Sequence, residues 1–483
     1  MQLFDYCVVT ASTERQAEEF RRLIGRRLEH ELYPREVEFR VYADPPAGRV
    51  GSGGGTLWAL HTLMSESGAT DARAFFGSRR ILVLHSGGES RRLPGYAPEG
   101  KLFTPLPVPS NSTLAPIALD LQLSLFFKYP WRRGELLVGS GDVVLDFDTS
   151  SLPEDRGHVC GFAKAAPPEQ ATHHGVFRFD RRRETVQDYF QKAPVPYLVE
   201  HATLEGSSDC ALDIGLVALS PEAASALVEF GGERVGGGTV LDALKNGTLR
   251  FDLYVELLMS ALSGLSVETF HERIAGQTAM PRAAADRLFA RFHPLPLRAV
   301  VARSTTFIHL GTLAEFPQAC REVVQRELRP FYDEEPGEIR PAVSRDRLLV
   351  NSSGVETIVK PSGFAVFEGC HDVRIDGAEG ETLFLGLEGG HVPATVPDGF
   401  CLDQRRLGEV SVLLVCSSVD TFRRPRAAED LVFCGKPLRV WLEERALSQS
   451  DVARGDGGDL LEAALFCAGV PLEFAAGYWN VPP

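Results

Sequence analysis

Residues 81–94 have the sequence ILVLHSGGESRRLP, which joins a short apolar run to a glycine pair and two arginines. The apolar run is rich in branched residues and predicts a buried parallel strand. After Ser86, the pair Gly87 and Gly88 carries no Cβ, so backbone N–H groups can come close to an anion. Because open α/β sheets bind ligands at the carboxyl ends of their strands, the segment predicts a phosphate-binding loop.

Basic side chains follow the glycines within a few residues. Arg91 and Arg92 lie near the end of the segment, and Lys101 comes after a turn that contains proline and glycine. These cations supply positive charge that the backbone lacks, so the stretch predicts a loop that binds a triphosphate. A strand followed by a surface turn with solvated arginines is the alternative.

Composition limits the class of protein. The chain has 483 residues, 44% of them apolar, so it is long enough for two or three domains with a large core. Its formal net charge of −15 argues against binding along a nucleic-acid backbone. Nine cysteines without a Cys-x-x-Cys pair predict reduced, buried thiols. No apolar stretch approaches a membrane span, and we expect a cytoplasmic protein that binds neither nucleic acid nor membrane.

A second glycine-rich segment precedes the first. The sequence GSGGGT, residues 51–56, lies between a predicted strand at Glu36–Tyr42 and a predicted helix at Leu57–Met64. A loop before a helix amino-terminus is a place where an anion or a base binds. A flexible linker is the alternative, because five of the six residues are Gly or Ser. The glycine order is not that of a dinucleotide-binding fingerprint. We expect nucleotide contact from Gly51, Gly53, Gly54, Gly55 and Thr56.

Two aspartates are candidates for a metal site. Asp142 follows the small residues Gly139-Ser140-Gly141 at the end of a predicted strand, and Asp252 stands at a strand-to-helix junction four residues before Glu256. Mg²⁺ beside phosphates needs one or two such carboxylates. An Asx turn or helix cap explains Asp142 equally well. A capping Asp with a surface Glu explains the second pair.

Three further polar residues stand in apolar surroundings. His173 and His174 are adjacent, and neighbouring side chains on a strand point to opposite faces, so a shared metal ion is not expected. Asp213 lies near the start of a predicted buried strand at Leu212–Leu219. A carboxylate there is costly unless it has a partner, which indicates a partner or a function for Asp213.

The pattern changes from about Arg298. Beyond Arg347, short branched runs recur with Gly, Asn or Asp between them. Short strands at this close spacing predict a parallel β-helix or another β-rich module. The repeat is too irregular to fix a period.

Several of these motifs resemble one family. Gly87, Gly88, Arg92, Leu93 and Lys101 match the Gly-Gly-x-Gly-Thr-Arg-Leu signature and later lysine of sugar-nucleotide pyrophosphorylases, whereas Ser90 and Arg91 replace its Gly and Thr. The form HSGGESRRLPGYAPEGK is similar to that of fucose-1-phosphate guanylyltransferases, which include the amino-terminal half of bifunctional fucokinase/GDP-fucose pyrophosphorylases. The segments GSGGGT, THHGVF and HLGTLAEF resemble the same branch, so the likeness covers about Phe4 to Cys416.

The resemblance implies a fold and a reaction. The expected fold is α/β, with a Rossmann-like nucleotidyltransferase domain for GTP and sugar phosphate (1–297), a parallel β-helix-like domain (298–430) and a helical or mixed tail (431–483). The expected enzyme uses Mg²⁺ and makes GDP-L-fucose and pyrophosphate from GTP and β-L-fucose 1-phosphate, by in-line attack on the α-phosphate.

The resemblance also assigns roles to residues. Arg91 and Arg92 would bind the β- and γ-phosphates, Lys101 would bind the α-phosphate, and Asp142 and Asp252 would hold Mg²⁺. The sugar phosphate would be bound by a third group, which comprises Lys192, Asp213, Gly215, His173, His174 and Gly175.

Other functions stay open at this point. The chain could use another sugar 1-phosphate or another nucleoside triphosphate, or it could be a regulatory paralogue that binds nucleotide sugars without catalysis. A dinucleotide-dependent oxidoreductase is disfavoured by the missing fingerprint. No segment resembles the phosphate loop of a galactokinase-class sugar kinase, so kinase activity is not expected. The oligomeric state is open.

Overall fold

The computed structural model describes residues 3–86, 92–97, 99–129, 131–179, 185–276, 279–333, 341–422, 424, 429–452, 465, 467–468 and 472–479. The chain divides into two compact units. The first unit comprises Met1–Gly88 and Gln122–Phe307, and the second comprises Glu89–Leu121 and Ile308–Pro483.

The second unit is formed by two separate segments of the chain. Residues 89–121 belong to the second unit although they directly follow the predicted strand of the phosphate loop. Residues 431–483 also belong to that unit, and the first unit ends at Phe307. The three expected parts stay a prediction. Composition changes along the chain reveal contiguous segments, whereas a compact unit is defined by contacts that join distant segments.

The first unit contains a mixed sheet. Its strands have the order β12-β6-β9-β4-β3-β1-β2, and the four from β4 to β2 are parallel. Strand β9 pairs antiparallel with β4, β6 and β7, and β7 pairs with β8. The bounds are β1 Tyr6–Ala11, β2 Glu38–Ala43, β3 Ile81–His85, β4 Leu136–Ser140, β6 Val159–Ala166, β7 Gly175–Phe179, β8 Val186–Gln191, β9 Cys210–Leu219 and β12 Leu297–Val301. The predicted strand in residues 81–94 is therefore confirmed as β3.

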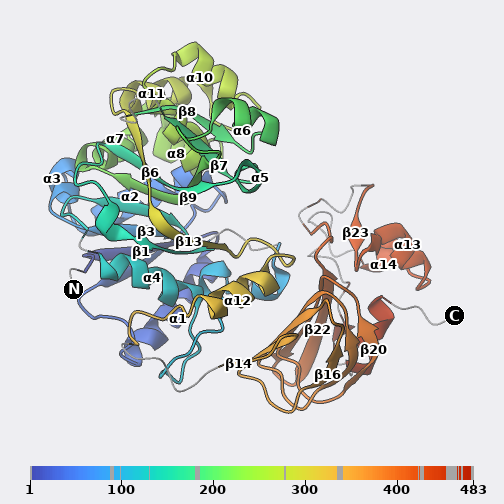
Figure 1. The fold of residues 1–483 in the computed structure, drawn as a ribbon. Helices are drawn as coiled ribbons and strands as arrows, with labels where there is room; N and C mark the ends of the chain where they lie inside the picture. Colours follow the sequence, from blue (N-terminus) through green and yellow to red (C-terminus); the bar gives the residue numbers. More distant parts are fainter. Residues whose placement is uncertain are drawn as a thin grey trace. The chain divides into compact units, whose positions relative to one another are not determined.

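Helices lie on both faces of this sheet (Figure 1). Helix α2 (Gly51–Glu66), α3 (Ala72–Gly77) and α7 (Pro221–Gly231) share one apolar core with alternate strand residues such as Val8 and Val83. Helices α1 (Glu14–Glu29) and α4 (Ala118–Lys128) lie on the other side, where the ring of Phe126 packs 6.3 Å from that of Phe4. The remaining elements of this part are β5 Val143–Asp148, α5 Pro168–Ala171, α6 Val195–His201, β10 Arg234–Val235, β11 Gly238–Thr239, α8 Val240–Lys245, α9 Leu258–Ser260, α10 Val267–Ile274, α11 Arg282–Phe292 and β13 Arg303–His309.

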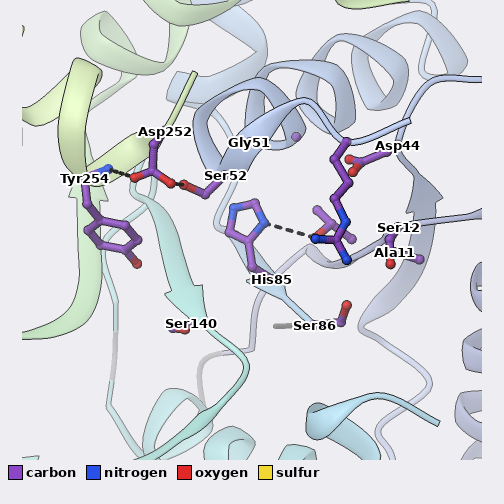
Figure 2. Close-up of a pocket in the computed structure, with 13 residues that line it drawn as sticks. Ala11, Ser12, Asp44, Gly51, Ser52, His85, Ser86, Ser140, Asp252 and Tyr254 are labelled. Carbon is purple, nitrogen blue, oxygen red and sulfur yellow. Dashed lines mark hydrogen bonds between the residues drawn. The ribbon is translucent and has the colours of Figure 1, made fainter. Parts of the chain in front are cut away.

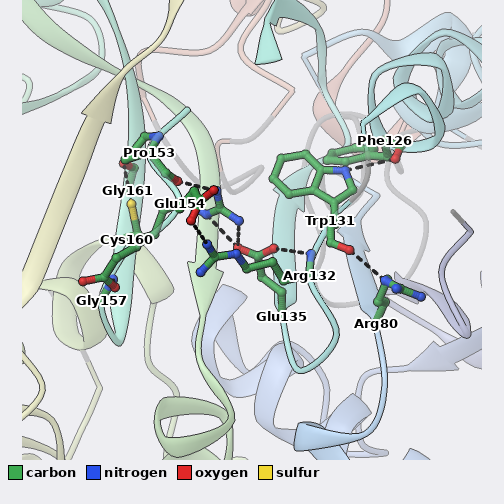
Figure 3. Close-up of polar contacts among 12 residues, drawn as sticks. Arg80, Phe126, Trp131, Arg132, Glu135, Pro153, Glu154, Gly157, Cys160 and Gly161 are labelled. Carbon is green, nitrogen blue, oxygen red and sulfur yellow. Dashed lines mark hydrogen bonds and ion pairs between the residues drawn. The ribbon is translucent and has the colours of Figure 1, made fainter. Parts of the chain in front are cut away.

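A buried ion pair joins the start of β4 to the chain before β6 (Figure 3). The guanidinium of Arg156 donates to the Glu135 carboxylate, with Nε 2.7 Å from Oε1, and the two side chains are 4% and 10% exposed. The Arg156 guanidinium also lies 5.7 Å from the centre of the Trp131 ring. Because Glu135 also accepts the backbone N–H of Arg132 at 3.0 Å, this pair fixes the chain that leads into β4.

In the second unit, the strands of two sheets alternate along the chain. Strands β15, β17, β19 and β21 are parallel neighbours in one sheet, and β16, β18 and β20 are parallel neighbours in the other. Paired residues such as Arg347 and Ala365, or Phe364 and Glu381, are 17 or 18 residues apart in sequence. The bounds are β15 Arg347–Val350, β16 Glu356–Val359, β17 Phe364–Glu368, β18 Arg374–Ala378, β19 Glu381–Leu385, β20 His391–Val396 and β21 Phe400–Leu407.

Shorter elements complete the second unit. They are α12 Phe316–Gln325, β14 Ala342–Val343, β22 Val410–Ser417, β23 Val432–Phe433, β24 Lys436–Pro437, α13 Leu438–Glu443, α14 Gln449–Val452 and β25 Cys467–Ala468. Eight cysteines of the chain are buried and form no disulfide, as expected for reduced thiols. Within the described ranges, no helix has both the length and the apolar character needed to cross a bilayer.

Candidate functional site

A cavity of about 270 Å³ opens in the first unit at the carboxyl ends of its parallel strands (Figure 2). This is the edge at which open α/β sheets bind ligands. Ser12, Asp44, Ser86 and Ser140 come from the ends of β1, β2, β3 and β4. The other described lining residues are Thr10, Ala11, Arg49, Gly51, Ser52, Gly55, His85, Asp252 and Tyr254. Gly87, Gly88 and Arg91 lie outside the described residues.

The second glycine-rich segment is the first turn of helix α2 and not a loop, so the predicted start at Leu57 is wrong. Phe251 explains the helical glycines, because Cβ atoms at Gly51 and Gly53 would lie 2.2 and 2.5 Å from its backbone oxygen and its ring. A Cβ at Gly54 would lie 2.9 Å from Val50. These three glycines therefore allow close packing inside the unit.

Gly55 differs from the other glycines of this turn. A Cβ there would lie 3.5 Å from Asp44 Oδ1 and 3.6 Å from His85 Cε1, which are ordinary contact distances. Gly55 thus borders the cavity, where it leaves open the space between Asp44 and His85. Of the five predicted nucleotide contacts in this segment, Gly51 and Gly55 line the cavity.

His85 is held in one neutral form between two threonines. Thr56 Oγ1 donates to the carbonyl of Ser52 at 2.9 Å and therefore accepts from Nε2 of His85, also at 2.9 Å. The unprotonated Nδ1 then accepts from Thr10 Oγ1 at 3.0 Å. Burial lowers the pKa of His85 to about 4, so the imidazole is neutral at pH 7.

Asp252 begins a turn of π-helix, η4 (Leu253–Leu257), beside the cavity. Its Oδ2 accepts from Ser52 Oγ and its Oδ1 accepts from the N–H of Tyr254, both at 2.8 Å (Figure 2). The Glu256 carboxylate accepts the N–H of Asp252 at 2.8 Å and is 1% exposed. The capping interpretation of Asp252 is therefore confirmed, whereas the surface position considered for Glu256 is wrong.

Asp213 shapes a bulge in β9. The pairing of β9 with β6 shifts between Gly161 and Ala163, and Gly215 in the bulge has φ of +73°. Asp213 accepts the N–H of Gly215 at 2.8 Å and the hydroxyl of Tyr189 at 2.5 Å. Each carboxylate oxygen thus has a donor within the unit, which is the partner that the sequence predicted for Asp213.

Burial and three carboxylates raise the pKa of Tyr254, which lines the cavity. Burial raises the pKa of Tyr254, and the charges of Asp213, Asp252 and Asp142 raise it further. Burial also raises the pKa of Asp213 to about 6, with a contribution from Asp252. A nearby cation would counter these charges, and carboxylate oxygens are ligands that Mg²⁺ uses, so Mg²⁺ at Asp142 and Asp252 stays a prediction. Ser140 Oγ donates to Asp142 at 2.6 Å.

No group of three or more metal-binding side chains occurs among the residues with described positions. Mg²⁺ beside phosphates uses one or two carboxylates and needs no such group.

The residues predicted to bind the sugar phosphate lie around β7 and β8. A Cβ at Gly175 would meet Tyr189 Oη at 2.1 Å, so Tyr189 occupies that space. His174 packs edge-on against Phe307, with ring centres 5.2 Å apart. His173 lies in the turn before β7. Lys192 directly follows β8 with φ of 51°, a conformation that is rare for a non-glycine residue and frequent at functional sites.

Two predicted phosphate-binding cations belong to the second unit. Lys101 is 1% exposed, and its Nζ donates to the carbonyl of Gly311 at 2.7 Å. The carbonyl of Arg92 accepts the N–H of Leu313 at 2.8 Å. Burial disfavours the charge of Glu315, but hydrogen bonding from His309 and the charge of Arg92 contribute to a lowered pKa. The segment HLGTLAEF (309–316) therefore contacts the basic part of the signature.

Arg405 holds the turn between these cations. Its guanidinium donates to Glu99 at 2.7 Å, to Asp403 at 2.9 Å, and to the carbonyl of Gly95. The roles of Arg92 and Lys101 stay predictions.

Asp44, His85 and Tyr254 are among the cavity residues that the sequence did not predict. Asp44 could have been found, because it lies two residues after the predicted strand Glu36–Tyr42, at the edge where ligands bind. His85 lies in the segment 81–94, but no spacing pattern marks it as a site residue. Tyr254 reaches the cavity through the packing of η4, which no local pattern reveals.

Comparison with known proteins identifies the family. The model of the "fucose pyrophosphorylase domain" matches residues 74–469. A Bacteroides fragilis protein named L-fucokinase/L-fucose-1-P guanylyltransferase is 28% identical over 436 residues, which are 88% of this chain and 42% of that protein. A Homo sapiens protein named fucose-1-phosphate guanylyltransferase is 31% identical over 185 residues, which are 37% of this chain and 29% of that protein.

A third relative, from Arabidopsis thaliana, is named bifunctional fucokinase/GDP-fucose pyrophosphorylase and is 27% identical over 259 residues, 47% of this chain and 24% of that protein. The chain thus covers less than half the length of each of these relatives. The family model nevertheless matches well over half of the chain, and the chain therefore belongs to the fucose pyrophosphorylase domain family.

Proposed function

We propose that this chain is a guanylyltransferase that makes GDP-L-fucose and pyrophosphate from GTP and β-L-fucose 1-phosphate. The observation that carries the proposal is the cavity at the carboxyl ends of β1 to β4, in a chain of the fucose pyrophosphorylase domain family. A cavity of about 270 Å³ is close to the lower limit of roughly 300 Å³ for ligand pockets and suits the nucleoside part of GTP.

The proposal includes the finer fold. We infer a Rossmann-like nucleotidyltransferase domain in the first unit, supported by the parallel order β2-β1-β3-β4 with helices on both faces. We infer a β-helix-like module in the second unit, supported by parallel pairs 17 or 18 residues apart. The cytoplasmic location stays a prediction from the sequence.

The proposed chemistry is nucleotidyl transfer. An oxygen of the sugar phosphate forms a bond to the α-phosphorus of GTP while the bond from that phosphorus to the β-phosphate oxygen breaks, and pyrophosphate leaves. The protein forms no covalent bond, so its residues act by position and charge. Asp142 and Asp252 would hold Mg²⁺, which supplies charge neutralisation when bound. Arg91, Arg92 and Lys101 are assigned to the triphosphate.

The sugar phosphate is assigned to Lys192. Its strained backbone is the observation that favours this role over that of an ordinary surface lysine. Asp213 has an indirect role in this proposal, because its oxygens already bind Tyr189 and Gly215 and hold the bulge of β9.

Pyrophosphate release tests the proposal. The protein is incubated with Mg²⁺, each of four nucleoside triphosphates and a panel of sugar 1-phosphates. We expect release that requires both GTP and β-L-fucose 1-phosphate. Pyrophosphate release with another nucleotide and sugar phosphate would overturn the substrate assignment. No release from folded protein that still binds GTP would support the regulatory alternative.

Gly55→Ala is expected to weaken GTP binding about tenfold, because one added methyl group between Asp44 and His85 fills part of the cavity. Stability should stay the same or rise, because alanine is favoured over glycine inside a helix by roughly 0.5–1 kcal/mol. Equilibrium binding of GTP and thermal unfolding measure the two effects.

Gly25→Ala is the matched control for this substitution. Gly25 lies in α1, and a Cβ there meets nothing within 4 Å. We expect unchanged GTP affinity in this variant. Equal affinities of Gly55→Ala and the unaltered protein would argue against nucleotide in this cavity.

A further inference from the structure

Asp44 is the starting point, because it directly follows β2 and lines the cavity beside the first turn of α2 (Figure 2). Its backbone N–H donates to the carbonyl of Ala11 at 2.8 Å, which fixes the residue next to β1. Its Oδ1 lies 3.5 Å from the position of a Cβ at Gly55, on the side where that glycine leaves space. Asp44 is half-buried.

The carboxylate of Asp44 is costly to ionise in this position. Burial raises its pKa to about 7, although the charge of Arg49 and the N–H of Val50 act in the opposite direction. Additional hydrogen-bond donors from a ligand would stabilise the ionised form. The environment therefore favours a ligand that brings N–H groups to this carboxylate.

Asp252 is the other acid among the cavity-lining residues that the structure describes. Its two oxygens already accept from Ser52 and Tyr254. Asp252 thereby caps η4, whereas the carboxylate of Asp44, which accepts the N–H of Val50, also borders the open space next to Gly55. Of the two acids, Asp44 is the better placed to accept from a ligand.

We propose that the Asp44 carboxylate recognises guanine, by accepting the N1–H and the 2-amino N–H of the base. This inference rests on the proposed function, and it deepens it by naming the residue that selects the base. Guanine presents those two donors side by side in one plane, which matches the two oxygens of a carboxylate.

Other bases do not offer this pair. Adenine has an acceptor at N1 next to its amino group, and a carboxylate placed against that acceptor is repelled. A site whose buried polar group stays unpaired with the wrong ligand discriminates strongly. Asp44 would therefore select GTP over ATP, because adenine leaves the carboxylate without a donor at N1.

Binding of GTP, ITP and XTP to the whole chain tests the proposal, because ITP lacks the 2-amino group and XTP carries a carbonyl in its place. We expect the unaltered protein to bind GTP at least about tenfold more tightly than ITP, since a hydrogen bond to a charged group is lost. Asp44→Asn should weaken GTP binding about tenfold or more. The same variant should bind XTP better relative to GTP, because the asparagine amide donates to the new carbonyl and its oxygen accepts from N1–H.

Asp71→Asn is the matched control. Asp71 caps α3 by accepting the N–H of Ala74 at 3.0 Å, and asparagine caps equally well. We expect this variant to keep the order of affinities of the unaltered protein.

Two results would overturn the inference. One is an Asp44→Asn protein, shown to be folded by its unfolding transition, with the same relative affinities for GTP, ITP and XTP as the unaltered protein. The other is an Asp44→Asn protein in which only the preference for GTP over 2′,3′-dideoxy-GTP is lost. That result would assign Asp44 to the ribose. Because binding is measured without turnover, guanine selectivity with no pyrophosphate release would support Asp44 and contradict the proposed function.

Discussion

Lys101→Ala is expected to lower turnover by at least about tenfold, and by up to about a hundredfold if Lys101 stabilises charge on the α-phosphate in the transition state. The lysine is 1% exposed, and its ammonium donates to the carbonyl of Gly311. A cation held in such a position can act on a phosphate without a large cost of reorganisation. Steady-state rates with saturating GTP and β-L-fucose 1-phosphate measure the effect.

The structural part of this effect must be separated from the catalytic part. Loss of the ammonium also removes a buried hydrogen bond, so the unfolding transition is measured on the same samples. Lys360→Ala is the matched control in the second unit, because that lysine is exposed and pairs with Glu379 on the surface. Folded Lys101→Ala protein with turnover within twofold of the unaltered enzyme would contradict the role of Lys101.

Glu135→Ala is expected to lower the free energy of unfolding by about 3–5 kcal/mol, because it leaves the buried guanidinium of Arg156 without its carboxylate. Arg156 keeps its bond to the carbonyl of Pro153 at 2.9 Å and its place near Trp131, but these neutral groups do not balance its charge. Urea unfolding followed by fluorescence measures the loss.

A neighbouring pair provides the control for this prediction. Glu154 lies 3.6 Å from Arg132, and its side chain is 98% exposed (Figure 3). Glu154→Ala should change the free energy of unfolding by less than about 1 kcal/mol, because solvent screens the charges. Similar losses in the two variants would show that the burial of the Glu135–Arg156 pair does not set its contribution.

The sequence predicts the strands of the first unit well. The apolar run Ile81–Leu84 corresponds to β3, because a buried parallel strand needs a continuous apolar segment. The segment Glu36–Tyr42, in which polar and apolar residues alternate, corresponds closely to the edge strand β2. The prediction from the sequence is wrong at the start of α2, where the glycines indicate a loop. Tertiary packing against Phe251 requires glycine there and overrides helix propensity.

The sequence predicts that the second unit is β-rich, but it does not reveal the regular spacing of the paired strands. Consecutive strands alternate between two sheets, so neighbours in a sheet are separated by an intervening strand and turns of unequal length. The period of 17 or 18 residues appears only when the pairing is known. Glu89–Leu121 belongs to this unit through contacts with residues far along the chain, which a local sequence pattern does not reveal.

Part of the candidate site could be placed from the sequence. Asp252 and Gly55 do lie at the cavity, because η4 and α2 begin beside it. The internal bonds of Asp213 and the tyrosine over Gly175 depend on the register of β7, β8 and β9, which a single sequence does not specify.

Transfer of label from [α-³²P]GTP to β-L-fucose 1-phosphate tests the central claim most directly, because it follows the phosphorus atom that is attacked. The products are separated by chromatography after incubation with the purified protein and Mg²⁺. We predict that the label appears in GDP-fucose and that its formation requires the sugar phosphate. Label that stays in GTP, or appears in GMP whether or not the sugar phosphate is present, would contradict the account.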